Sequence, residues 1–339
     1  MSFWRFPKEK CNCRGAAEWS YMTNWKQTVI RTPRLILRPW EESDAPDLYR
    51  FARDPLVGPA AGWPPHTSVE NSREIIRGVL SARETYALVL RYPTTDPYSG
   101  EEIPAGTCVG SVGIMPYGCG SYPHMKRTEA EIGYWVGLPL WGRGLIPEAV
   151  RAIQARCFTE LRLDGLWCGY YEGNEKSRRV QEKCGFSPRC RLEIPPHPIN
   201  GAVAECFTYL SREVWEAMQE PLTMDMSLRP APFRAVASGH KTLELRLYDD
   251  KRQLIKAGDT LRFTFVGRAE QVCAEVVAVH YFPTFKALYA ALIPTMGAAA
   301  LGYGEGETPD PADMLAYYSE DAITRLGVVG IEITLKANG

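Results

Sequence analysis

The chain has 339 residues, which is long for a single hydrophobic core, so we expect two domains. A hydrophobic share of 45% and a charged share of 23% are those of an ordinary globular protein. The net charge of −1 gives no general attraction for polyanions. No apolar run approaches the roughly 18 residues that span a bilayer, so no membrane role is expected. The ten cysteines form no CxxC pair, which argues against a metal site and favours a protein of the reducing cytoplasm.

The beginning of the chain has no clear periodicity up to Met22. It lacks the charged start and apolar core of a signal peptide. Two interpretations stay open, a disordered leader or an extension upstream of a start at Met22. Residues 1–22 are therefore treated as a leader of uncertain order.

Strand and helix patterns alternate from about residue 28. The run Thr28–Pro39 is predicted as one extended strand. Asp44 is predicted to cap a helix, and Thr67 with Glu70 forms a capping-box pattern at the start of another. Later strands are predicted at 86–91, 108–115, 130–137, 165–171 and 206–211, with helices after Pro147 and at 175–184.

The pattern changes around residues 212–226. A short helical stretch leads into Pro221, after which strand patterns dominate. Strands are predicted at 241–248, 259–266, 271–281 and 328–335, and helices at 233–238 and 284–292. We therefore expect a first domain over 23–212, a linker over 213–223 and a second domain over 224–339.

The most informative segment is a strand that enters a two-glycine turn, which in turn begins a helix. Gly142 and Gly144 let backbone N–H groups converge without obstruction by a Cβ atom. Pro147 suits the first helical turn, where its missing donor costs nothing. The unpaired N–H groups and the helix dipole would together form a site for a pyrophosphate. Two glycines alone are a weak signal.

Three sequence motifs, taken in chain order, strengthen the prediction of a pyrophosphate site. The glycine turn resembles motif A of the GNAT acetyltransferase superfamily, Q/R-x-x-G-x-G/A, with Trp141 and Ile146 departing from it as the RimJ/RimL branch does. Thr32–Pro39 resembles the opening strand of that branch, and Asn174–Phe186 its N-x-x-S-x-x-v-x-x-K-x-G-F signature. The resemblance implies an α+β fold whose mixed, mostly antiparallel sheet has flanking helices. It also implies acetyl-CoA as co-substrate and acetyl transfer to a primary amine: a protein N-terminus, a small amine or an RNA-linked amine.

The same resemblance implies which residues hold the co-substrate. The pantetheine arm would pair with the backbone of Trp135 and Val136, and Asn174 and Ser177 would lie beside the thioester. The pyrophosphate would accept hydrogen bonds from the backbone of Gly142, Arg143, Gly144, Leu145 and Ile146.

Catalytic roles follow from the resemblance and from chemistry. Many family members carry an acidic tyrosine seven residues after the asparagine, where this chain has Gln181, so Ser177 is the closest substitute for that acid. Glu131 is a candidate base acting through water, with a strand-surface charge as the equal alternative. Asn174 is expected either beside the thioester or as a turn cap. Glu148 is expected to complement the helix dipole rather than to act on substrate.

A second candidate site lies on one predicted strand of the C-terminal part. Thr242, Glu244 and Arg246 share one face of that strand, which by itself is typical of a solvated surface. With Lys241 they match motif residues of the ASCH domain, which the segment 224–339 resembles. This implies a small PUA-like β-barrel and a cleft for RNA or a nucleoside. The amidohydrolase members have a threonine where this chain has Glu244.

Further polar residues in this part of the chain leave alternatives open. Lys251, Arg252 and Lys256 are expected either to contact phosphates or to form a polar hairpin tip. His280 is expected to be a packed core histidine.

Three functional interpretations remain open on the sequence. The first is an acetyl-CoA-dependent N-acetyltransferase whose second domain guides substrate choice. The second is an RNA- or nucleotide-binding module that senses acetyl-CoA. The third is a hydrolase of a modified nucleoside. Acceptor loops are expected at 54–66 and 92–106.

Overall fold

The computed structural model describes residues 28–336, so the leader predicted over 1–22 lies outside the described residues. The chain divides into two compact units, one up to Gln219 and one from Glu220 onward. Each unit is described by itself. Within residues 28–336 no helix combines the length and the apolar character needed to cross a membrane.

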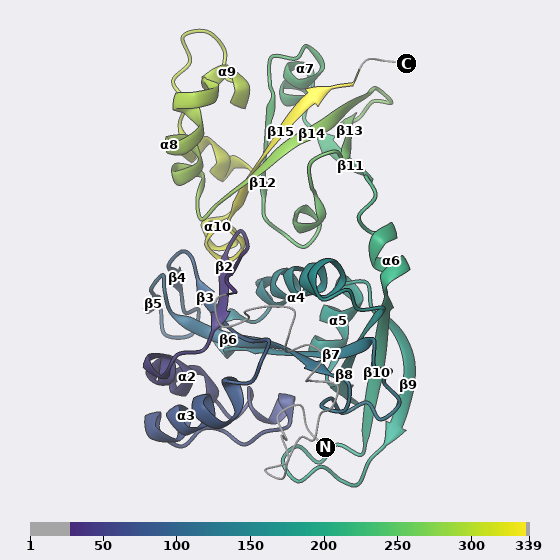
Figure 1. Cartoon of the computed structure of the whole chain (residues 1–339). Helices are drawn as coiled ribbons and strands as arrows, with labels where there is room; N and C mark the ends of the chain where they lie inside the picture. The colour runs from purple at the N-terminus through teal and green to yellow at the C-terminus, as the bar shows by residue number, and fades with distance from the viewer. Residues whose placement is uncertain (1–27, 337–339) are drawn as a thin grey trace. The chain divides into compact units, whose positions relative to one another are not determined.

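The first unit is built on an eight-stranded sheet in the order β1-β2-β3-β6-β7-β8-β10-β9 (Figure 1). All neighbouring strands are antiparallel except β7 and β8, which run parallel. The strands are β1 (Ile30–Arg31), β2 (Leu35–Pro39), β3 (Thr85–Leu90), β6 (Cys108–Pro116), β7 (Glu129–Val136), β8 (Gly165–Tyr171), β9 (Ser187–Glu193) and β10 (Ala204–Ser211). A small separate ribbon pairs β4 (Thr94–Thr95) with β5 (Glu102–Ile103).

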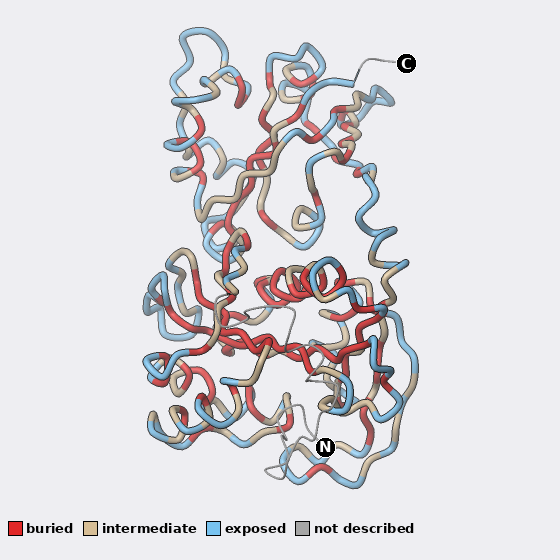
Figure 2. The backbone as a smooth tube through the Cα atoms, viewed as in Figure 1, coloured by how far each residue is buried: buried red, intermediate tan, exposed pale blue. Residues whose placement is uncertain are grey.

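Helices cover both faces of this sheet. The helices α2 (Ala45–Ala52) and α3 (Val69–Ile75) lie on one face, and α4 (Leu145–Ala155) and α5 (Glu175–Lys183) lie on the other (Figure 1). Because both faces are covered, the central strand β3 is buried along its whole length and reads as a continuous apolar run. The buried residues follow the middle of the sheet and the inner side of α4 (Figure 2). The short helix α6 (Arg212–Ala217) ends the unit.

Two predictions, for the first strand and for the first residue of a helix, differ from the structure. The run 28–39 is a tight hairpin, β1 and β2, rather than one strand, with Ile30 opposite Leu37. Its turn is closed by the Thr32 amide, which donates to the Leu35 carbonyl at 2.9 Å, and Pro33 suits such a turn. Helix α3 is capped by Ser68, whose Oγ accepts from the Asn71 amide, one residue later than the predicted Thr67.

The second unit holds a curled five-stranded sheet in the order β11-β13-β14-β15-β12. Its only parallel pair among the described strands is β11 with β13. The strands are β11 (Thr223–Leu228), β12 (Leu243–Leu247), β13 (Thr260–Phe265), β14 (Gln271–Phe282) and β15 (Val328–Leu335), and the helices are α7 (Pro230–Ala237), α8 (Phe285–Met296), α9 (Ala298–Leu301) and α10 (Glu320–Leu326). The predicted α+β class is confirmed for the chain.

Candidate active site

The glycine turn presents two unpaired backbone donors. Gly142 and Gly144 have φ angles of 74° and 73°, which only glycine adopts readily, and α4 begins directly after Gly144. The first bond of the helix runs from the Glu148 amide to the Gly144 carbonyl at 3.3 Å, so the amides of Leu145 and Ile146 have no acceptor among residues 28–336. A Cβ atom built on Gly142 would meet nothing within 4 Å. Open space therefore lies before a helix start with free donors, the arrangement that binds phosphate groups.

A buried ion pair between Arg34 and Glu148, here called the Arg34 bracket, fixes the orientation of the glycine turn. The Arg34 guanidinium donates to the carbonyls of Arg143 and Gly144 at 2.6 and 2.9 Å. Its Nε pairs with the Glu148 carboxylate at 2.6 Å, and Glu148 also accepts from the Thr32 hydroxyl at 2.5 Å. Because the carbonyls of the turn are held on the Arg34 side, the neighbouring amides face away from it. Glu148 is thus a buried ion-pair partner of the opening hairpin.

The Arg143 side chain takes no part in the open side of the turn. Its guanidinium donates to the Thr94 hydroxyl at 2.5 Å and to the Thr95 carbonyl at 2.7 Å, both in β4. The predicted phosphate contact of Arg143 concerns its backbone and stays a prediction. The side chain instead ties the turn to the β4–β5 ribbon.

The sheet forks beside this turn. Pairing between β7 and β8 stops at Glu131 and Trp167, although β7 continues to Val136 and β8 to Tyr171. Because the Gly137 amide donates to Val109 in β6, the alternation of an antiparallel pair directs the backbone of Val136 and Tyr134 into the fork and that of Trp135 towards β6. The register thus favours pairing of a ligand with Tyr134 and Val136, whereas Trp135 was predicted in place of Tyr134.

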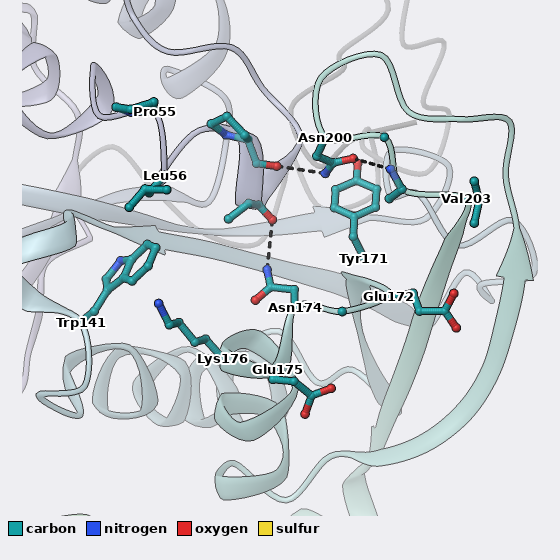
Figure 3. Close-up of a pocket in the computed structure, with 15 residues that line it drawn as sticks. Pro55, Leu56, Trp141, Tyr171, Glu172, Asn174, Glu175, Lys176, Asn200 and Val203 are labelled. Carbon is teal, nitrogen blue, oxygen red and sulfur yellow. Dashed lines mark hydrogen bonds between the residues drawn. The ribbon is translucent and has the colours of Figure 1, made fainter.

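A cleft of about 770 Å³ opens at the end of the fork (Figure 3). It is lined by residues 55–56 and 59–60 on one side, by Trp141 and residues 171–176 on the other, and by residues 200–203. The first predicted acceptor loop, 54–66, thus contributes to the cleft, and no residue of 92–106 is among its lining. Lys176 Nζ lies 3.8 Å from the centroid of the Trp141 ring, which places a cation beside the glycine turn.

Asn174 is engaged at both ends of its amide group. Its Oδ1 caps α5 by accepting from the Ser177 amide at 3.1 Å, and its Nδ2 donates to the Ala60 carbonyl at 3.1 Å. Asn200 holds the same loop by donating to the Pro59 carbonyl at 2.9 Å (Figure 3). These contacts hold residues 59–60, on one side of the cleft, to Asn174 at the start of α5 and to Asn200. A direct contact of Asn174 with a thioester stays a prediction.

Ser177 belongs to a chain of hydroxyl and amide groups. Its Oγ lies 3.0 Å from the Tyr134 hydroxyl and accepts from Gln181 Nε2 at 3.2 Å. Gln181 Oε1 in turn accepts from the Thr208 hydroxyl at 2.8 Å. Burial raises the pKa of Tyr134 well above its ordinary value, so this phenol keeps its proton and can donate it in a hydrogen bond. Sequence reasoning missed Tyr134, because only the packing of α5 on β7 brings it to Ser177.

Glu131 is fully buried, which excludes its interpretation as a strand-surface charge. It accepts from the Ser121 hydroxyl at 2.8 Å and from the Tyr122 amide at 2.9 Å. The same hydroxyl lies 3.1 Å from the carboxylate of Glu205 in β10. Burial raises the pKa of Glu131, and burial followed by the charge of Glu131 raises the pKa of Glu205 to about 7. Sequence reasoning missed Glu205, although a single acid in the apolar strand Ala204–Leu210 was a usable signal.

The second unit places three of the four predicted cleft residues together. Glu244 is 2% exposed and pairs with Lys241 at 2.8 Å and with Arg246 at 2.9 Å. Lys241, which precedes β12, thus forms a buried charge cluster with Glu244 and Arg246 of β12, with one excess positive charge, and this is not a solvated surface. Thr242 neighbours the cluster in sequence, and its backbone amide donates to the Ala300 carbonyl.

The other polar residues of this unit are engaged locally. Lys251 donates to the Asp225 carbonyl, Arg252 pairs with Asp249, and Lys256 pairs with Asp259. These internal pairings favour the hairpin-tip interpretation. His280 is half-buried and bonds to Glu332 at 3.2 Å rather than packing in the core as predicted.

In comparison with known proteins, each unit matches one family profile. Residues 34–187 match the family profile of the Acetyltransferase (GNAT) domain, and residues 226–336 match that of the ASCH domain.

Individual relatives cover parts of the chain. A Bacillus subtilis (strain 168) protein, provisionally named ribosomal N-acetyltransferase YdaF, is 43% identical over 60 residues. The matched segment is 18% of this chain and spans only 33% of that protein's length. The uncharacterized N-acetyltransferase p20 of Bacillus licheniformis is 27% identical over 47% of this chain and 82% of its own. The structure of Mycobacterium smegmatis RimJ in complex with CoA-disulfide superposes with a TM-score of 0.44, at 22% identity, over 63% of this chain and 96% of that one.

Proposed function

The chain carries a GNAT acetyltransferase domain followed by an ASCH domain, and from this premise we propose that it transfers the acetyl group of acetyl-CoA to a primary amine. The observation that carries the proposal is the helix start with unpaired amides at Leu145 and Ile146, backed by the Arg34 bracket. A diphosphate is the part of coenzyme A that such a site fits.

The remaining parts of acetyl-CoA find matching groups along the fork. The backbone of Tyr134 and Val136 would pair with the amides of the pantetheine arm, as an added strand does. Lys176 and the Trp141 ring at the mouth of the cleft add a cation and an aromatic face. When bound, acetyl-CoA supplies an activated acyl group. The residues of this chain orient it and exchange protons.

Two proton transfers are required of the protein. The acceptor reaches the site mainly as an ammonium ion and must lose a proton before it can attack. The departing thiolate must gain one. Ser177 is the candidate donor in place of the tyrosine that Gln181 replaces. Tyr134 and Gln181, both within hydrogen-bond distance of its Oγ, would orient this hydroxyl.

The acceptor is proposed to be the amine of a protein chain. The Bacillus subtilis relative with 43% identity over 60 residues is provisionally named a ribosomal N-acetyltransferase, which supports this choice. The cleft of about 770 Å³ has room for the first residues of an extended peptide.

A thiol-release assay tests the transferase proposal. Free thiol would be measured with acetyl-CoA and a panel of N-terminal peptides of ribosomal proteins, polyamines, aminoglycosides and aminoacyl nucleosides. We expect peptides with a free N-terminus to raise release above the rate without acceptor. If no amine raises release while the protein still binds coenzyme A, the acetyl-CoA-sensing alternative replaces the transferase.

For the second unit, we propose that the charge cluster on β12 binds RNA or a nucleoside. Two cations on one buried carboxylate leave an excess positive charge at Lys241 and Arg246, which supports an anionic or strongly polar ligand. Lys241→Ala should weaken retention of a total-RNA fraction without lowering thiol release from acetyl-CoA with a small amine. Lys251→Ala, at the hairpin tip, is the matched control. Equal retention by both variants would contradict the proposal.

A further inference from the structure

Two buried carboxylates face one hydroxyl at the point where β7 and β8 separate. Glu131 is the last residue of β7 that pairs with β8, and Ser121 Oγ lies 2.8 Å from Glu131 Oε1 and 3.1 Å from Glu205 Oε1. A hydroxyl carries one proton and can donate to only one of the two oxygens. The partners of the two carboxylates in the described part of the chain are the Ser121 hydroxyl and the Tyr122 amide, neither of which carries a charge. Two negative charges at such a site are strongly disfavoured.

Each of the two carboxylates packs closely against a glycine, whose missing side chain leaves room for it. A Cβ atom on Gly120 would lie 2.4 Å from Glu131 Oε2, and one on Gly169 would lie 2.8 Å from Glu205 Oε1. Gly169 lies two residues beyond Trp167, where β8 no longer pairs with β7 but still pairs with β10. The Glu205 carboxylate therefore packs against the backbone of Gly169, next to the place where β7 and β8 separate.

Glu205 is the member of the pair that is nearer the cleft. It stands directly opposite Tyr171, which lines the cleft, and directly opposed residues of an antiparallel pair project from the same face. Glu205 keeps 4% of its surface exposed, whereas Glu131 keeps none. Both oxygens of Glu131 accept hydrogen bonds, whereas Glu205 Oε2 has no partner among residues 28–336.

We propose that Glu131 and Glu205 share a single proton through Ser121, and that Glu205 accepts the proton which the acceptor ammonium must lose. The step breaks one N–H bond of the ammonium ion and forms one O–H bond on Glu205, with the electron pair of the broken bond left on nitrogen. The pair passes from its doubly ionised form to the form that shares one proton through Ser121, and later returns that proton to water. Glu131 acts as a positioning residue, held by the Tyr122 amide. This inference rests on the proposed transferase activity.

The groups around Glu205 are consistent with this role. The titratable residues described next to it are Glu131 through Ser121, Tyr171 across the strand pair, and Cys168 on β8, whose thiol feels the charge of both carboxylates. None of the three is a cation. The raised pKa of Glu205, about 7, suits a group that takes and releases a proton near neutral pH.

The first test compares two amines of nearly equal size. Ethylamine is an ammonium ion at pH 7, whereas the fluorines of 2,2,2-trifluoroethylamine keep it mainly neutral. Glu205→Gln should lower kcat for thiol release with ethylamine by about 100-fold, and with trifluoroethylamine by less than about threefold. The KM for acetyl-CoA should not change. Glu193→Gln, an exposed carboxylate of β9, is the matched control. Equal losses with both amines would make Glu205 a structural residue and overturn the proposal.

The second test needs no turnover and so separates this inference from the transferase proposal. Infrared difference spectra of wild type against Glu205→Gln should contain the band of a protonated carboxyl group at pH 6. That band should disappear as the pH rises through about 7. Ser121→Ala should shift that titration, because it removes the bridge. Absence of a protonated carboxyl at pH 6 would overturn the shared proton, whereas absence of thiol release with any amine would overturn only the transferase.

Discussion

The carboxyl group of Glu205 makes the free energy of unfolding depend on pH. Its pKa is raised from 4.5 to about 7 in the folded protein, first by burial and then by the charge of Glu131. Between these values the folded state binds a proton that the unfolded state has released. The free energy of unfolding therefore falls as the pH rises through this window, and the Glu205 contribution levels off above about pH 7.

Replacing Glu205 by glutamine should remove this dependence. Relative to wild type, Glu205→Gln should gain about 2 kcal/mol of unfolding free energy between pH 5 and pH 8, because the buried charge is absent. Urea unfolding at both pH values measures the difference. Glu193→Gln should show no such change. A difference between Glu205→Gln and wild type that is the same at both pH values would mean that Glu205 titrates normally in the folded protein.

Arg34 acts on the phosphate site through the backbone. Lysine at this position would keep a positive charge beside Glu148 but could not hold the carbonyls of Arg143 and Gly144 together. Arg34→Lys should raise the KM for acetyl-CoA by about tenfold and change kcat by less than about twofold. Arg77→Lys, in the exposed pair with Glu42, is the control for the same substitution. An unchanged KM would mean that the turn holds its shape without Arg34.

Among secondary-structure elements, those with strong local patterns were predictable. β8 and β15 begin and end at the predicted residues, and α5 begins at Glu175 as predicted. The hairpin of β1 and β2 was not predicted, because both arms are extended and only their mutual pairing reveals the reversal. Strand β9 was missed since five of its seven residues are exposed, so it shows no apolar period.

The same distinction between local sequence patterns and long-range contacts applies to the residues of the candidate site. The glycine turn is local, so its two glycines, the following proline and the helix start could be predicted from the sequence. The carboxylate of Glu205 and the hydroxyl of Tyr134 are functional candidates only because β10 and α5 lie beside the fork. No spacing within the sequence indicates either contact. Trp135 and Tyr134 are neighbours, and the register with β6 decides which backbone faces the fork.

A side-chain hydrogen bond holds the end of β7 to the glycine turn. The Trp141 indole donates to the Val136 carbonyl at 2.8 Å. Trp141→Phe should keep an aromatic ring for Lys176 and lose this donor, which should raise the KM for acetyl-CoA by about three- to tenfold. Trp215→Phe, in α6, serves as the control. A KM equal to that of wild type would show that the turn does not depend on this link.

At the scale of the whole molecule, each unit has a hydrophobic core of its own. The residues of the first core lie between Ile30 and Trp215, and those of the two C-terminal clusters lie between Leu222 and Ile333. Among residues 28–336, none of these three clusters contains residues of both units. We therefore expect the chain to unfold as two cooperative parts.

A single core truncation tests this division. Phe263 is fully buried in β13, and Phe263→Ala should destabilise the C-terminal unit by about 3–5 kcal/mol. Calorimetry should show one transition shifted to lower temperature and the other unchanged, and thiol release should keep its wild-type kcat. Ile132→Ala in β7 should shift the opposite transition. A parallel shift of both transitions by either variant would contradict independent unfolding.

The most direct test of the account concerns the amides at the start of α4. Asparagine and aspartate can both adopt the left-handed backbone of Gly142, and a Cβ atom there meets open space. Gly142→Asn and Gly142→Asp have nearly the same shape and differ mainly in a charge placed before the helix start. Titration calorimetry with coenzyme A should give a dissociation constant at least about tenfold higher for the aspartate variant than for the asparagine variant, with the gap narrowing as salt is added. Equal affinities of the two variants would mean that the pyrophosphate does not bind at Leu145 and Ile146.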